Sequence, residues 1–171
     1  CVIFALALES CGNNRDLMGY DHPGPPNIMV CFVPLDGFSG KEAILLSKEF
    51  FKNFAETQWE SYCVKTLEHK TTPPSCLNDS KSRFRGNKII RWLSTECPND
   101  IKNNKEIDKS INYEYYFIGV TDKDISTNVH NHKDYGILGL SYLGKGDVSI
   151  ISTHRLKRRK DLWKLAVHEF C

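Results

Sequence analysis

The sequence lacks the features that would place it in a special class of protein. Its 23 lysine and arginine residues nearly balance its 21 aspartate and glutamate residues, so no charge excess indicates a nucleic-acid partner. Its seven cysteines form no C-x-x-C pair, and zinc-ribbon or thioredoxin-type motifs are therefore missing. There is no internal repeat. With 40% hydrophobic and 26% charged residues, the 171-residue chain is typical of one globular domain rather than a disordered or collagen-like protein.

The first residues predict a secretion signal rather than a membrane span. Residues 1–8 form an apolar run that is far shorter than the roughly 20 residues needed to cross a bilayer, but has the length of a signal-peptide core. Leu8, Glu9, Ser10 and Cys11 follow the order of a bacterial lipobox, with Glu9 a departure from the usual pattern. We therefore predict that residues 1–11 are the remnant of a lipoprotein signal peptide and that Cys11 carries the lipid.

A polar segment rich in proline and glycine, residues 12–27, reads as a tether after this anchor. We expect the protein to lie on the periplasmic or cell-surface side of a bacterial membrane and to be attached to it through Cys11. The alternative is a cytoplasmic protein in which residues 1–8 are an ordinary strand or helix start and Cys11 occurs there by chance.

The hydrophobic pattern from residue 28 onward alternates strands with helices. Residues 28–35 are a continuous apolar run, typical of a strand that is buried on both faces. Ser39 is a candidate cap for a helix over residues 41–57, where apolar residues recur at helical spacing. Further strands are predicted at 62–67, 115–121, 137–143 and 148–152, and further helices at 87–98 and 162–171. This order predicts an α/β fold with a mostly parallel sheet and an antiparallel last pair.

The remaining segments read as connections. Residues 122–133 are predicted to be a long polar loop, and residues 99–112 an exposed one. Asp161 is a candidate cap for the last helix. Cys31 and Cys63 lie among apolar neighbours and are interpreted as buried thiols, whereas Cys76 and Cys97 could pair.

The last residues of the chain include a His-Glu pair, His168 and Glu169, on the predicted final helix. Such a pair by itself is usually just an exposed part of a helix. It is also the first half of an H-E-x-x-H motif, in which two histidines at i and i+4 share one helix face and bind one zinc ion. The glutamate then lies beside the metal and takes the proton of the attacking water.

Four blocks of sequence, in a fixed order, favour the zinc-motif interpretation of His168 and Glu169. They are GVTDKDI at 119–125, DYGILGLSY at 134–142, SIISTHRL at 149–156 and KLAVHE at 164–169. In this order they resemble the archaemetzincins, a family of metzincin-type zinc metallopeptidases. Residues 28–57 also fit the family's opening strand and helix by pattern, but residues 60–112 do not match it in detail.

The resemblance implies a zincin-like three-layer α/β domain over residues 28–171, with a twisted, mixed five-stranded sheet and packed helices. It implies that strand 137–143 is the antiparallel edge with which an extended peptide or protein substrate pairs. His168 matches the first ligand of a catalytic Zn²⁺ and Glu169 the general base. The family's further ligands would lie beyond residue 171, so the chain as written is expected to be the N-terminal part of the catalytic domain, without a complete zinc site and inactive by itself.

Other interpretations stay open at this stage. The principal alternative is a degenerate zincin domain that acts as a non-catalytic binding module on a lipid-anchored surface protein. His130, His132 and His154 are expected to be solvent-exposed or structural rather than metal ligands. Asp122 and Asp124 are expected to form turn hydrogen bonds. The basic residues 155–160 are interpreted as a solvated segment, with no nucleic-acid partner.

Overall fold

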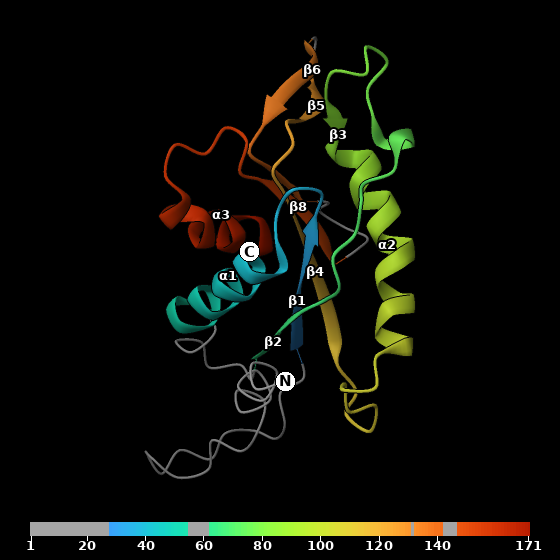
Figure 1. Ribbon diagram of the computed structural model, residues 1–171, viewed down its shortest axis with the longest axis vertical. Helices are drawn as coiled ribbons and strands as arrows, with labels where there is room; N and C mark the ends of the chain where they lie inside the picture. The colour runs from blue at the N-terminus through green and yellow to red at the C-terminus, as the bar shows by residue number, and fades with distance from the viewer. Residues whose placement is uncertain (1–27, 55–61, 131, 142–146) are drawn as a thin grey trace.

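The computed structural model describes residues 28–54, 62–130, 132–141 and 147–171 (Figure 1). The predicted signal remnant 1–11, with Cys11, and the predicted tether 12–27 lie outside these residues. Among the residues that are described, no helix combines the length and the apolar character needed to span a membrane.

The centre of the fold is a mixed five-stranded sheet in the order β2-β1-β4-β8-β7. Its strands are β1 (Ile28–Leu35), β2 (Tyr62–Thr66), β4 (Glu114–Thr121), β7 (Gly139–Ser141) and β8 (Val148–Ser152). The pairs β1–β2, β1–β4 and β4–β8 are parallel, and β7–β8 is antiparallel. The predicted mostly parallel sheet with one antiparallel edge strand is confirmed.

Helices cover both faces of this sheet and make three layers. Helices α1 (Gly40–Asn53) and α3 (Leu162–Phe170) lie on one face, and α2 (Gly86–Asn103) lies on the other (Figure 1). Alternate residues of β1 supply the two cores: Val30 packs with α1 and α3, whereas Val33 packs with α2. Both side chains are fully buried, as expected for a strand that points successive side chains to opposite, covered faces.

Helix α1 begins as its sequence predicts. The Ser39 hydroxyl accepts a hydrogen bond from the Glu42 amide, while the Glu42 carboxylate accepts one from the Ser39 amide, which completes a capping box. The helix ends at Asn53, earlier than the predicted residue 57, and residues 55–57 lie outside the described part of the chain.

Helix α2 is longer than its sequence suggests. It was expected to end near Pro98 but continues to Asn103 with the proline inside it. The buried side chains Leu93, Cys97 and Ile101 form one continuous stripe that crosses Pro98. The burial of this stripe outweighs the cost of a proline within the helix, about 3 kcal/mol.

The polar segment 122–133 is not a loop, which corrects the prediction. It contains β5 (Ile125–Val129) and the start of β6 (His132–Ile137), which pair antiparallel and join β3 (Phe84–Arg85) in a second, three-stranded sheet. The predicted strand 137–143 is correspondingly divided, because Ile137 ends β6 and β7 starts at Gly139. Tyr142 and Leu143 lie outside the described residues.

Three smaller expectations are also wrong. Asp161 stands at the N-cap of α3 but makes no capping hydrogen bond; its carboxylate instead pairs with Arg158 and Lys164. Cys76 and Cys97 are free, buried thiols rather than a pair. Cys31 is a buried free thiol as predicted, whereas Cys63 is disulfide-bonded.

Candidate active site at the end of helix α3

Helix α3 is held against the sheet by its apolar face. Leu162 and Ala166 are buried in the core that α3 shares with α1. At the last turn, the Phe170 ring lies among aromatic rings from α1, β2 and β4, with centroid distances of 5.0 Å to Tyr116 and 5.8 Å to Phe50. This aromatic packing fixes the turn that carries His168 and Glu169.

Glu169 lies against the edge strand β7. The hydroxyl of Ser141 is 2.6 Å from the Oε2 atom of Glu169 and 2.5 Å from its main-chain carbonyl oxygen. The first distance is within the usual hydrogen-bond range, and the second lies at its short limit. The structure thus brings the predicted general base to the strand at which an extended peptide was expected to pair.

The absence of a side chain at Gly139 makes this approach possible. A Cβ atom at residue 139 would lie 2.5 Å from Oε1 of Glu169 and 2.7 Å from its Cγ and Cδ atoms. Gly139 and Ser141 are two residues apart on β7, so they share the strand face that meets α3.

His168 precedes Glu169 on the same turn and is exposed. A neutral imidazole is a normal zinc ligand, so this residue suits the role that the sequence predicts. Among the residues that the structure describes, however, no group of three or more His, Cys, Asp or Glu side chains could hold a metal ion. His168 therefore does not form a metal site with the other described residues.

The remaining sequence candidates lie apart from this pair. His130, His132 and His154 are exposed. Asp122 accepts a hydrogen bond from the Gly37 amide at 3.0 Å, as expected for a residue that stabilises a turn. Asp124 forms ion pairs with Arg83 and Arg155 instead, and these arginine bonds lower the pKa of its carboxyl group.

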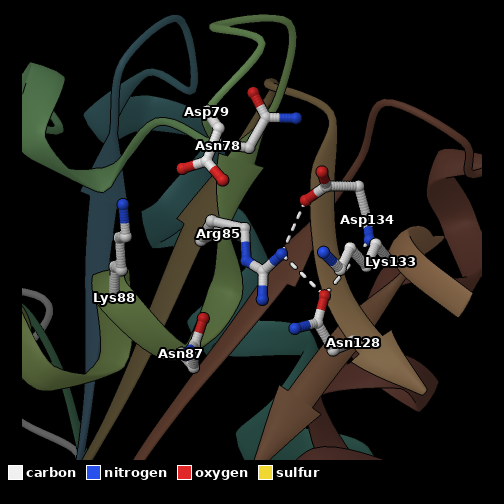
Figure 2. A pocket seen from close by; sticks show the side chains of 8 residues that line it. All are labelled: Asn78, Asp79, Arg85, Asn87, Lys88, Asn128, Lys133 and Asp134. Carbon is white, nitrogen blue, oxygen red and sulfur yellow. Dashed lines mark hydrogen bonds and ion pairs between the residues drawn. The ribbon is translucent and has the colours of Figure 1, made fainter. Parts of the chain in front are cut away.

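A surface pocket lies elsewhere, between the N-terminal end of α2 and the three-stranded sheet (Figure 2). Two of its cationic side chains are bonded to neighbouring groups. Arg85 bonds to Asp134 at 2.6 Å and to Asn128 at 2.8 Å, and the Lys88 ammonium donates to the Leu77 carbonyl oxygen at 2.8 Å. The pocket contains neither His168 nor Glu169, so it is separate from the candidate active site.

Sequence reasoning assigned no role to Gly139 or Ser141, although both lie in one of the four ordered blocks. The signal that could have found them is their spacing, since a glycine and a serine two residues apart on an edge strand face the same side. Their partner, Glu169, is 28 residues from Ser141, and only the packing of α3 beside β7 connects them.

Comparisons with known proteins show what the fold is similar to. No protein-family model matches the sequence, and no curated protein matches it significantly. Among solved structures, the chain is similar to the archaemetzincin of Archaeoglobus fulgidus, crystallised with malonate, with a TM-score of 0.58 and 21% identity over 84% of this chain and 75% of that one. It is also similar to the archaemetzincin of Methanopyrus kandleri, with a TM-score of 0.55 and 15% identity over 84% and 71% of the two chains. The chain therefore has the zincin-like fold of the archaemetzincins.

Proposed function

We propose that this chain is part of a zinc-dependent metallopeptidase of the archaemetzincin type. The observation that carries the proposal is the position of Glu169. This residue directly follows the exposed His168 in the chain, and its carboxylate lies beside the edge strand β7. The fold shared with two archaemetzincins supports it. The remaining zinc ligands would come from residues other than those described.

In this proposal the two residues have different tasks. His168 contributes one imidazole nitrogen to a zinc ion, which, when bound, activates water and polarises the peptide carbonyl as a Lewis acid. Glu169 accepts the proton of the attacking water and can then deliver it to the leaving amine, since a carboxylate is suited to both steps. The carboxylate oxygens lie where β7 can present a substrate to them.

The substrate class follows from the strand. In the described residues, β7 pairs with β8 only, so its outer edge is open to another strand. An extended peptide could add to this edge through main-chain hydrogen bonds, which recognise backbone rather than a particular side chain. We therefore propose a peptide or protein substrate bound in extended form.

The test uses the full-length protein that contains this chain. Glu169→Gln keeps the size of the side chain but removes the base, so it should abolish peptidase activity while bound zinc, measured by elemental analysis, is unchanged. Glu68→Gln is the matched control because Glu68 is exposed and follows β2 at the opposite edge of the sheet; this variant should retain full activity.

Two results would overturn the proposal. Full activity in Glu169→Gln would exclude Glu169 as the general base. A full-length protein that binds no zinc and cleaves no peptide would instead indicate a degenerate zincin domain acting as a binding module.

We also propose that the protein is anchored to a membrane through a lipid on Cys11. The support is the lipobox-like order of residues 8–11 after an apolar run. Mass spectrometry of the N-terminal peptide from native membranes should show a lipidated Cys11, and Cys11→Ser should release the protein into the soluble fraction. An unmodified peptide that extends through residues 1–11, or a Cys11 that is joined to Cys63 in a disulfide, would disprove the anchor.

A further inference from the structure

We infer that Gly139 and Ser141 act together as positioning residues for the Glu169 carboxylate. Gly139 provides the space for this side chain, and Ser141 provides the hydrogen bond that selects its orientation. The inference rests on the proposed function, in which Glu169 is the general base, and it gives two residues of the edge strand a task beyond binding a peptide backbone.

The space at Gly139 is fitted to the Glu169 side chain. The missing Cβ would come within 2.7 Å of the Cγ, Cδ and Oε1 atoms, a separation that real Cβ contacts essentially never show. Because the carboxylate is the flexible end of its side chain, an added methyl group at residue 139 would move Glu169 rather than unfold the domain. Gly139 thus determines where the carboxylate can lie.

The bond from Ser141 then selects one position within that space. A serine hydroxyl has a single proton, and here it is shared between the Glu169 carboxylate and the Glu169 carbonyl oxygen. A glutamate side chain has several rotatable bonds whose freedom must be lost before reaction. A donor that holds it in place beforehand removes part of that cost from the catalytic step.

Both sides of this contact are attached to rigid parts of the fold. Ser141 pairs with the buried Ser149 of β8, and Gly139 pairs with the buried Ile151. On the other side, the residue after Glu169 is Phe170, whose ring lies in the aromatic cluster. The hydroxyl and the carboxylate are therefore set by two anchored elements, as precise positioning requires.

Steady-state kinetics of the full-length protein test the inference. Ser141→Ala should lower kcat about 10- to 100-fold, the range expected when a general base is misplaced, with KM and zinc content unchanged. Ser141→Thr keeps the hydroxyl and should restore most of kcat. Gly139→Ala should lower kcat by a similar factor. The matched controls are Ser94→Ala, on the exposed side of α2, and Gly40→Ala, where no atom lies within 4 Å; both should leave kcat unchanged.

The hydrogen bond between Ser141 and Glu169 can also be tested without zinc. In a double-mutant cycle on the metal-free protein, urea unfolding of Ser141→Ala, Glu169→Ala and the double variant should give at least about a tenfold coupling in the unfolding equilibrium constant. This is the size expected for a half-buried hydrogen bond to a charged group. Fully additive effects would show that the two side chains do not interact.

The two proposals fail in different ways. If Glu169→Gln is inactive while Ser141→Ala and Gly139→Ala keep normal kcat, only the positioning role is wrong. If Glu169→Gln itself is fully active, the proposed function is wrong, whatever the serine does.

Discussion

Asp124 accepts two hydrogen bonds from Arg155, with Nε 2.7 Å from Oδ1 and Nη2 2.8 Å from Oδ2. Arg83 adds a third contact, with its Nε 2.8 Å from Oδ2. Asp124 directly precedes β5, Arg83 precedes β3, and Arg155 follows β8 of the large sheet. The Asp124 carboxylate thus connects the three-stranded sheet to the five-stranded sheet.

This carboxylate should make stability depend on pH. The Arg155 hydrogen bonds are the main reason that the pKa of Asp124 is lowered, and the side chain is only 16% exposed. A carboxyl whose pKa is lower in the folded than in the unfolded state, where it is about 3.9, stabilises the protein above that pH. The contribution is lost as the pH falls through the folded-state pKa.

We therefore expect Asp124→Asn to lower the free energy of unfolding by about 1–3 kcal/mol at pH 7, and by progressively less below pH 4. Urea unfolding at several pH values measures the difference between the variant and the parent protein. Asp79→Asn, at an exposed aspartate, is the control and should show little difference at any pH. A difference for Asp124→Asn that is the same at pH 7 and pH 3 would contradict this explanation.

Gly136 should be sensitive to substitution because the Arg155 guanidinium lies where a Cβ atom would be. Gly136→Ala should push the guanidinium away from Asp124 and cost about 1 kcal/mol of unfolding free energy. Gly40→Ala is the contrasting variant: its Cβ meets nothing within 4 Å, and alanine favours the first turn of α1, so stability should be unchanged or rise by about 0.5 kcal/mol.

The same experiment in an Arg155→Ala background separates the mechanism from a general effect of the glycine. Thermal or urea unfolding should show that Gly136→Ala costs almost nothing there, because the displaced partner is missing. An equal cost in both backgrounds would indicate that the backbone, rather than the Asp124 contact, requires glycine.

Phe170 should matter for the stability of the last turn of α3. Its ring contacts the rings of Phe50, Phe54, Tyr62 and Tyr116, and truncation would open this cluster. Phe170→Ala should therefore reduce the free energy of unfolding by about 2–4 kcal/mol, and Phe170→Leu by less.

Leu45→Ala is the matched control for this prediction. Leu45 is 62% exposed on α1, so its truncation should change unfolding free energy by less than about 0.5 kcal/mol in the same denaturation series. Equal effects of Phe170→Ala and Leu45→Ala would show that the aromatic cluster contributes no more than exposed surface.

The buried thiols should be unreactive in the folded protein. Burial raises the pKa of Cys97 to about 12 and raises that of Cys31 further, so almost no thiolate is present at pH 8. Iodoacetamide followed by mass spectrometry should leave both residues unmodified in native protein and modify both in urea. Rapid labelling of Cys97 under native conditions would show that this side of α2 opens readily.

Local sequence signals determined much of the framework. The unbroken apolar run of β1 is typical of a strand covered on both faces, and Ser39 marks the start of α1 because a cap acts within one helical turn. The ordered blocks also placed His168 and Glu169 on a final helix, where the structure has them. These features were predictable because their causes lie within a few residues of one another.

Tertiary structure alone decided the rest. The segment Ile125–Val129 carries too many small polar residues to read as a strand, and it becomes one because β3 and β6 supply its hydrogen bonds. Helix α2 passes Pro98 because the sheet buries the residues on either side. Glu169 meets Ser141 only because α3 packs beside β7, and a contact across 28 residues depends on the free energy of the whole core, which no local pattern encodes.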